Sequence, residues 1–357
     1  MSLFRTDLLH ADAPSDTKVP RKKHMMCLNE SILNPYPLID EAFNQTMQDV
    51  SLNRYFDDIR DTLHKLLTEY VGHGIKEENI IWANGADDML YNIFLAVRED
   101  NDSFALSLAP SYFDYSTFTR AVGLNFETLD FNDDLDFDAD KYLKVLNSKN
   151  CRLGILCNPN NPTGQLLSDD KILYILRNTE KPVLLDETYF EFSGATMVDR
   201  VKDFSNLIIV RSFSKAFSMA GVRFGYMISQ EKNTLEIRKA QTVFNVSSLV
   251  QAFVVSILLN KHVFLAHTKK AIELTKQMHS DLGALPNVKV MPTQTNFVTF
   301  TIGEKTSKLF EYLKEHEIAI RDVGAHRLLK NYLRASCGSY EQNAYFLEQV
   351  KNFLKLS

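Results

Sequence analysis

The chain has 357 residues, of which 45% are hydrophobic and 24% are charged, and its formal net charge is −5 at pH 7. Because a single hydrophobic core stops growing at roughly 250–300 residues, this length predicts two unequal domains in an ordinary soluble protein. The acidic balance argues against nucleic acid or an anionic membrane surface as the main partner, and no apolar stretch approaches the roughly 20 residues that span a bilayer.

The amino-terminal segment and the cysteines indicate the cellular compartment in which the protein is found. The first thirty residues contain no apolar core of the kind found in secretory signals. The four cysteines, Cys27, Cys151, Cys157 and Cys337, show neither the CxxC spacing of a metal site nor a dense disulfide framework. We therefore expect a cytoplasmic protein with reduced thiols and without a metal site.

The first half of the chain begins with a polar arm and continues with alternating helices and strands. Residues 1–28 are irregular in pattern, and we expect this arm to be partly mobile. Residues 57–71 predict a helix, because apolar side chains recur along one face. Residues 80–83 form a short apolar run that ends at Asn84-Gly85, and a helix follows to residue 97.

Short apolar runs predict the remaining strands. Continuous runs of this kind suit strands that are covered on both faces, as in a mostly parallel α/β sheet. After about residue 245 the pattern changes to long helices and a closing helix, with two further strands. This change predicts a large domain over residues 49–245 and a small α+β domain from residues 29–48 and 246–357. The predicted strands are 104–108, 153–157, 182–186, 207–210, 224–228, 296–300 and 332–336.

The first motif is NPNNPTG at residues 158–164, directly after the strand at 153–157. Two prolines and a glycine favour a rigid turn, and the carboxyl ends of strands are where open α/β sheets bind ligands. An asparagine in this turn, such as Asn161, can donate a hydrogen bond to a cofactor oxygen. An ordinary loop is the alternative.

The second motif is LLDETY at residues 184–189, where Asp186 closes a buried apolar strand. A buried carboxylate is costly unless something pairs with it, and a protonated pyridine nitrogen is such a partner. Tyr189, three residues later, could reach the phenolic oxygen of the same ring. The alternative is that Asp186 caps a helix.

The third motif, at residues 211–225, places two serines, a lysine and an arginine after a strand. The hydroxyls of Ser212 and Ser214 and the guanidinium of Arg223 suit a phosphate group. Lys215 can form a Schiff base with an aldehyde, and neighbouring positive charge lowers the pKa of its amine. A basic surface loop is the alternative, but the small and apolar residues around Lys215 argue against it.

The fourth motif is the strand-to-helix junction at residues 84–88, whose free amides attract a phosphate. Asp87 or Asp88 could also cap the helix, and both roles are compatible. Further on, Tyr112 follows another strand and is suited to stacking on a planar ring. A packed surface tyrosine explains it equally well.

The segments PNNPTG, LLDETYFEF and SFSKAFSMAGVRFGY resemble the class I/II aminotransferases of fold type I, and among them the histidinol-phosphate aminotransferases most. The resemblance extends from about residue 29 to the carboxyl terminus. It implies a mostly parallel seven-stranded sheet covered by helices, together with a smaller α+β domain. It also implies pyridoxal 5′-phosphate (PLP) as cofactor and transamination between histidinol phosphate and 2-oxoglutarate.

The resemblance implies roles for the residues of these motifs. Lys215 would hold PLP as a Schiff base and move protons, and Asp186 would pair with the pyridine nitrogen. Tyr189 and Asn161 would bond the phenolic oxygen, and Tyr112 would stack on the ring. The phosphate would be held by Ser212, Ser214 and Arg223 and by the junction residues Gly85, Ala86 and Asp87.

The resemblance also implies how substrate is bound. Arg334 matches the arginine that binds the substrate carboxylate, and Arg321 the one at the substrate's phosphate end, with Asn161 nearby. Tyr55 matches a tyrosine that reaches the phosphate of the neighbouring subunit, which implies a homodimer with shared active sites. Tyr36 would line the substrate pocket, but residues 29–37 contain extra residues and lack the family's glycine after this tyrosine.

Three alternatives stay open at this stage. The stretch 320–323 also resembles threonine-phosphate decarboxylases, which use the same cofactor. An aminotransferase for another, aromatic amino acid fits the same motifs. A non-catalytic PLP-binding regulator would carry a DNA-binding domain, and the early start of the motifs and the acidic balance argue against it.

Overall fold

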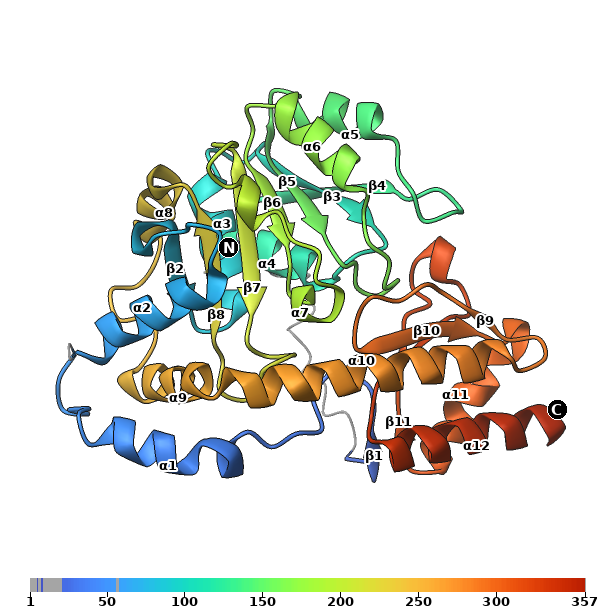
Figure 1. The fold of residues 1–357 in the computed structure, drawn as a ribbon. Coiled ribbons are helices and arrows are strands. Elements are labelled where there is room, and N and C mark those ends of the chain that lie inside the picture. The colour runs from blue at the N-terminus through green and yellow to red at the C-terminus, as the bar shows by residue number, and fades with distance from the viewer. Residues whose placement is uncertain (1–4, 6–7, 9–20, 56–57, 357) are drawn as a thin grey trace.

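A computed structural model describes residues 5, 8, 21–55 and 58–356 of the chain. Figure 1 shows a sheet with helices on both faces, a long helix beneath it, and a smaller sheet with its own helices towards the carboxyl terminus. We call the first sheet with its helices the large unit, and the smaller sheet with its helices the small unit. The mobility predicted for the arm concerns mainly residues 1–4, 6–7 and 9–20, which lie outside the described residues.

The large unit is built on a seven-stranded sheet in the order β2-β8-β7-β6-β5-β3-β4. All neighbouring pairs between β7 and β4 are parallel, whereas β8 is antiparallel to both β7 and β2. The predicted mostly parallel sheet is therefore confirmed. The strands are β2 (Ile80–Ala83), β3 (Phe104–Ala109), β4 (Asn125–Asp130), β5 (Cys151–Cys157), β6 (Val183–Asp186), β7 (Leu207–Ser212) and β8 (Gly225–Ser229).

The strand β4 was not predicted from the sequence. Its residues, NFETLD, are mostly exposed and form no continuous apolar run, because β4 lies at the edge of the sheet and pairs only with β3. The other strands of this sheet start and end within about two residues of the predicted bounds, as usual for assignments of element ends.

Alternate residues of each strand contribute to two separate cores, because side chains along a strand point to opposite faces. Ile81 and Ala83 pack with one group of helices, while Ile80 and Trp82 pack with the other. The first face is covered by α3 (Ala86–Val97), α4 (Asp114–Val122) and α8 (Glu231–Arg238). The second is covered by α2 (Ile59–Val71), α5 (Ala139–Leu146), α6 (Asp169–Arg177), α7 (Phe190–Ser193), α9 (Ser248–Leu259) and α10 (Lys261–Gly283).

The small unit is an antiparallel four-stranded sheet in the order β12-β13-β10-β9, packed on two helices of its own and on the carboxyl-terminal part of α10. The strands are β9 (Lys289–Val290), β10 (Phe297–Thr301), β12 (Arg321–Asp322) and β13 (Leu333–Ser336), and the helices are α11 (Thr306–Glu315) and α12 (Tyr340–Leu356). Single 3₁₀ turns occur at η1 (Glu77–Asn79), η2 (Val198–Arg200), η3 (Gly303–Lys305) and η4 (Arg327–Leu329).

The amino-terminal part of the chain contacts both units. Strand β1 (His24–Met25) pairs in parallel with β11 (Ile318–Ala319) of the small unit. Helix α1 (Tyr36–Met47) lies along α9 instead, and its Ile39 belongs to a core of the large unit (Figure 1). The division into residues 1–28, 29–48 with 246–357, and 49–245 stays a prediction.

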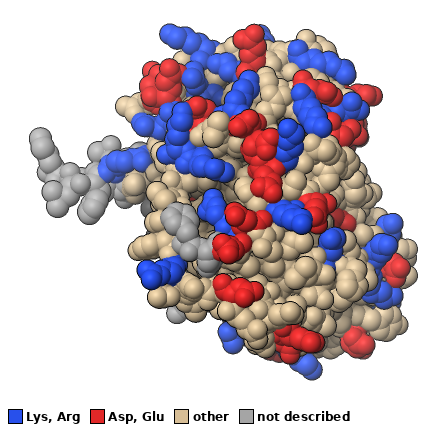
Figure 2. Space-filling view, turned by 60° about the vertical axis from the view of Figure 1, so that its left-hand side comes forward, with Lys and Arg blue, Asp and Glu red and all other residues tan. Residues whose placement is uncertain are grey.

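The viewed surface carries charged side chains of both signs. Figure 2 shows Lys and Arg mixed with Asp and Glu over the face that carries α2 and α8. Within the described part of the chain no single helix is both long and apolar enough to cross a membrane, and α9 and α10 meet both conditions only as a pair, across a 74° bend. All four cysteines are buried free thiols.

Candidate active site

A pocket of about 330 Å³ lies between the carboxyl ends of β5, β6 and β7, the start of α3, and the small unit. The carboxyl ends of parallel strands meet at one edge of a sheet, so motifs far apart in the sequence converge there. Of the predicted site residues, the pocket is lined by Ala86, Asp87, Tyr112, Asn161, Asp186, Tyr189, Ser212, Ser214, Lys215, Arg223, Arg321 and Arg334.

Asp186 is the buried last residue of β6, and three hydrogen bonds orient its carboxylate. The Tyr115 hydroxyl donates to Oδ2 at 2.6 Å, and the Thr188 hydroxyl and backbone amide donate to Oδ1 at 2.6 and 3.0 Å. Burial raises the pKa of Asp186, while these hydrogen bonds act in the opposite direction. The alternative of a helix cap is wrong, because Tyr189 occupies the N-cap of α7.

Lys215 reaches the pocket from the loop after β7. Its Nζ donates to the carbonyl oxygen of Leu28 at 2.9 Å. Burial, followed by the positive charge of Arg334, lowers the pKa of Lys215 to about 8. A substantial fraction of its amine is therefore neutral near physiological pH, and only the neutral amine is a nucleophile.

Two glycines let backbone and guanidinium approach closely at the start of α3. A Cβ on Gly85, whose φ is +93°, would lie only 2.5 Å from Nη2 of Arg223, and a Cβ on Gly225 would overlap the backbone of Ala86. Arg223 also contacts the Asp87 carboxylate at 2.9 Å. Free amides of a helix N-terminus beside a guanidinium form a cradle for a phosphate group.

Arg334 lies at the opposite side of the pocket, on β13. Its Nη1 donates to Oδ1 of Asn161 at 2.6 Å and its Nη2 to the carbonyl oxygen of Cys27 at 2.9 Å. Its buried Nε has no hydrogen-bond partner within the described residues. Arg321 lies nearby over the ring of Phe113, at 5.4 Å. These two guanidinium groups suit an anionic group of a bound molecule.

Several residues of the pocket were not predicted from the sequence. The Asn29 side chain donates to the Tyr189 hydroxyl at 2.8 Å, although the two residues are 160 positions apart. Asn29 belongs to the segment 29–37 that resembled the family, and this was the only signal for it. Tyr115 gave no signal, because it lies inside α4. Other residues added to the lining are Leu28, Glu30, Asp114 and Thr188.

Three predicted residues, Gly85, Tyr55 and Tyr36, are not among those that line this pocket. Gly85 occupies the N-cap of α3. Tyr55 is 77% exposed and stacks on Phe244 with ring centroids 4.3 Å apart. Tyr36 begins α1, where it contacts Phe43, because the chain turns into this helix directly after Pro35. The segment 28–30 forms the pocket wall instead of Tyr36.

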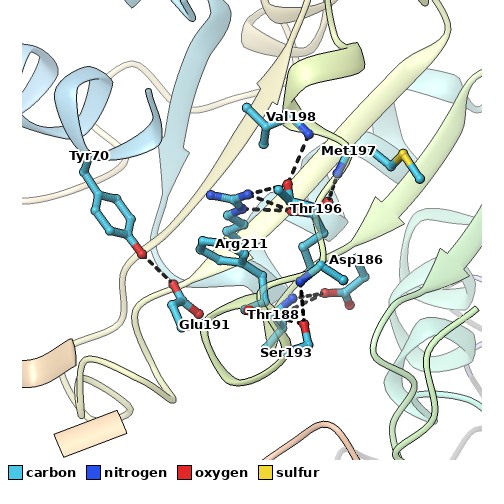
Figure 3. A network of polar contacts seen from close by, with 12 residues as sticks. Tyr70, Asp186, Thr188, Glu191, Ser193, Thr196, Met197, Val198 and Arg211 are labelled. Carbon is cyan, nitrogen blue, oxygen red and sulfur yellow. Dashed lines mark hydrogen bonds and ion pairs between the residues drawn. The ribbon is translucent and has the colours of Figure 1, made fainter. Parts of the chain in front are cut away.

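A buried polar network supports the turn after Asp186 (Figure 3). Arg211 donates to Oε2 of Glu187 through Nε at 3.0 Å and Nη2 at 2.9 Å, and both residues are almost fully buried. Oε1 of Glu187 accepts from the backbone amide of Met197 at 2.8 Å. The guanidinium also lies 3.6 Å from the ring centroid of Phe190. The network ties the segment after β6 to β7 and so fixes the end of β6 that carries Asp186.

The pocket fits the kind of cofactor implied by the sequence, an aldehyde with a pyridine ring and a phosphate. A partly neutral amine at Lys215, a buried acid at Asp186 and a phosphate cradle around Arg223 line one cavity. The buried acid needs a positive partner, the cradle needs an anion, and the amine can react with a carbonyl. Arg321 on β12 and Arg334 on β13 can bind an anionic group of the substrate.

Comparisons with known proteins agree with this arrangement. Residues 23–350 match the family described as aminotransferase class I and II. The chain is 31% identical over 335 residues to a histidinol-phosphate aminotransferase of Thermoanaerobacter sp. (strain X514), covering 93% of each chain.

Solved structures show the same fold. The histidinol-phosphate aminotransferase from Sinorhizobium meliloti, in complex with pyridoxal-5′-phosphate, has a TM-score of 0.84 at 22% identity, with 99% of each chain covered. The L-threonine-O-3-phosphate decarboxylase from Porphyromonas gingivalis has a TM-score of 0.78 at 24% identity, with 93% of this chain and 99% of that chain covered.

Proposed function

The chain belongs to the class I and II aminotransferases and therefore uses PLP, and we propose that it transfers the amino group of histidinol phosphate to 2-oxoglutarate. The observation that carries this proposal is the placement of Lys215 and Asp186 in one pocket with Arg321 and Arg334. A relative similar over 93% of both chains bears this activity in its name, which supports histidinol phosphate as the donor.

In the proposed site each side chain has a physical task. When bound, PLP supplies a protonated ring that withdraws electrons from the reacting carbon of the substrate. The Asp186 carboxylate keeps the ring nitrogen protonated, and the network around Arg211 keeps this carboxylate in place. Nζ of Lys215 anchors the cofactor and then removes and returns the proton of the substrate carbon, since its pKa near 8 suits both directions.

The remaining residues orient the two molecules. Tyr189 and Asn161 bond the phenolic oxygen of the cofactor, and Tyr112 covers its ring. Arg334 and Arg321 hold the phosphate of the amino donor or the carboxylates of the acceptor. We propose that the cofactor phosphate is held by Ser212, Ser214, Arg223 and the segment Gly85, Ala86 and Asp87.

A decarboxylase for an amino-acid phosphate is the second candidate, because a threonine-phosphate decarboxylase shares the fold with a TM-score of 0.78. The same two arginines would suit its phosphorylated substrate. The two reactions differ in their products. Release of CO₂ from threonine phosphate without consumption of a 2-oxo acid would favour the decarboxylase.

The decisive experiment is a half-reaction screen on the purified holoenzyme. Histidinol phosphate should convert the cofactor to its amino form, seen as loss of the imine absorbance band, and 2-oxoglutarate should restore the band. Aromatic amino acids and threonine phosphate are the competing donors. The variant Lys215→Ala should lack the band and nearly all turnover. A response to another donor alone would reject histidinol phosphate, and normal activity of Lys215→Ala would reject the site.

We further propose a cytoplasmic homodimer in which Tyr55 completes the site of the neighbouring subunit, with small molecules rather than nucleic acid or a membrane as partners. The exposed, apolar neighbourhood of Tyr55 supports this, since Leu52 is 66% and Val243 75% exposed. Exposed apolar side chains of this size often mark a surface that another chain covers.

A further inference from the structure

A second cavity, of about 230 Å³, lies at the outer edge of the seven-stranded sheet. The edge strand β2 forms its floor with residues 80–82. Its walls are Arg60 and His64 of α2, Arg238 at the end of α8, and residues 241–243 and 245. None of these residues lines the pocket around Lys215, so the two cavities are separate.

Two guanidinium groups meet in this cavity without an acidic partner. Neither Arg60 nor Arg238 has an ion pair or a side-chain hydrogen bond with any residue among 5, 8, 21–55 and 58–356. Burial and the like charge of Arg238 lower the pKa of Arg60. Arg60 lies 5.1 Å from the ring centroid of Trp82, which holds it in place by a cation–π contact.

The neighbouring carboxylates do not neutralise these two arginines. Glu77 faces His64 at 3.8 Å and is 55% exposed on its side chain. Glu236, on the same helix as Arg238, contacts Lys239 at 2.7 Å. Asp61 is exposed on α2, and it raises the pKa of Arg60 by less than burial and Arg238 lower it. The cavity therefore keeps an excess of positive charge.

The backbone acceptors at the floor of the cavity are already occupied. The Trp82 carbonyl oxygen accepts from the side chains of Gln241 at 3.0 Å and Asn245 at 2.6 Å. The Ile80 carbonyl oxygen contacts Nε2 of His64 at 3.3 Å. The side-chain amide oxygens of Gln241 and Asn245 remain as acceptors, but the charged groups without a partner among the described residues are the two guanidinium groups. A cavity of this kind selects an anion over a cation.

We propose that this cavity binds the phosphate group of a small phosphorylated molecule between Arg60 and Arg238. A phosphate monoester carries about 1.5 to 2 negative charges at pH 7 and three acceptor oxygens, which match two guanidinium groups, whereas a carboxylate offers one charge and two oxygens. Figure 2 views this side of the molecule, where Lys and Arg lie among Asp and Glu.

The test measures binding of inorganic phosphate to the PLP-loaded enzyme by equilibrium dialysis. Arg238 is exposed, so Arg238→Gln should leave the fold intact. We expect the wild-type enzyme to bind one more phosphate per chain than Arg238→Gln, or to bind it more than tenfold more tightly. Arg60→Lys keeps the charge but loses the planar fork, and it should give an intermediate affinity.

Arg177→Gln, at an exposed position at the end of α6, is the matched control and should bind phosphate like the wild type. Turnover at saturating substrate should be unchanged in Arg238→Gln. Identical phosphate binding by wild type and Arg238→Gln would overturn the proposal. So would dissociation of the Arg238→Gln oligomer in sedimentation without any change in phosphate binding, because a carboxylate of a second subunit would then occupy the cavity.

Discussion

At the scale of single residues, the chemistry of the pocket depends on how the buried acid is hydrogen-bonded. The Asp186 carboxylate accepts from Tyr115 and twice from Thr188, and these contacts oppose part of the rise in pKa that burial causes. An acid that stays ionised can keep a pyridine nitrogen protonated, so Tyr115 acts on the cofactor through Asp186 without touching it.

Tyr115→Phe should therefore weaken the cofactor's electronic activation with little effect on the fold. Loss of one hydrogen bond to a charged acceptor costs about 1.5–3 kcal/mol, so kcat should fall roughly tenfold or more. PLP affinity should fall as well, and the pH dependence of the cofactor absorbance band should shift. Tyr142→Phe, another fully buried tyrosine bonded only to backbone carbonyls, is the control. Equal spectra for the two variants would contradict the role of Tyr115.

The amine of Lys215 gives a pH prediction of its own. Its pKa of about 8 means that half of the amine is in the reactive neutral form at pH 8, and that this form levels off only at a pH well above 8. The rate of imine formation between apoenzyme and PLP, followed by stopped-flow absorbance, should show this inflection. Arg334→Gln removes a positive charge and should move the inflection to higher pH. An inflection near the ordinary value of 10.5 in the wild type would contradict the assignment.

At the scale of elements, the segment between β6 and η2 is held by a set of buried polar contacts, which Figure 3 shows from close by. Glu187 pairs with Arg211 of β7, and Glu191 accepts from the Tyr70 hydroxyl of α2 at 2.9 Å. Removing one partner of a buried ion pair leaves an uncompensated charge, which is far more costly than losing a surface pair.

Glu187→Gln should destabilise the protein by about 3–5 kcal/mol, because Arg211 is then left charged without its carboxylate. Urea unfolding measures this loss. Glu236→Gln breaks the exposed pair with Lys239 and should cost less than about 1 kcal/mol. Similar losses in both variants would show that the buried pair contributes no more than a surface one.

Glu191 should make stability fall as pH rises. Burial raises its pKa from 4.5 to about 7, so the folded protein holds this proton more tightly than the unfolded chain. The cost of ionising it is absent below pH 4.5 and fully present above pH 7. Glu191→Gln should thus raise the free energy of unfolding at pH 8 by about 1–3 kcal/mol and leave it nearly unchanged at pH 5. A gain of equal size at both pH values would contradict this.

At the scale of the whole molecule, the pocket lies where two units meet. The large unit contributes Lys215 and Asp186, and the small unit contributes Arg321 and Arg334. Asp130, at the end of β4, contacts Arg327 at 2.6 Å and His326 at 3.0 Å and so ties the units together beside the pocket. The geometry of the site therefore depends on how the units are packed.

Sharing of sites between subunits can be tested by mixing two inactive variants. In the proposed composite site one subunit supplies Lys215 and its partner supplies Tyr55. Lys215→Ala and Tyr55→Ala therefore remove residues that come from different subunits. In a symmetric dimer, equal mixing and reassociation should restore about a quarter of the wild-type sites, because half of the dimers are hybrids with one intact site. Activity should be measured before and after exchange. No recovery, with exchange verified by sedimentation of labelled chains, would place Tyr55 outside the partner's site.

The sequence by itself was enough to predict the strand that ends at Asp186, the strand that precedes Lys215, and most of the residues that line the pocket. These strands are buried on both faces, so each of them is a continuous apolar run in the sequence. The polar residues that follow such a run are therefore easy to recognise. The mostly parallel order follows from the same local alternation of strands and helices.

Only the tertiary structure decided which distant groups act on these residues. The contacts of Tyr115 with Asp186 and of Asn29 with Tyr189 span 71 and 160 positions, and no local pattern encodes them. The edge strand β4 and the turn of the chain into α1 were likewise missed, because an exposed strand has no continuous apolar run and the packing of α1 depends on α9. Local propensity determines elements, whereas long-range packing determines which side chains meet.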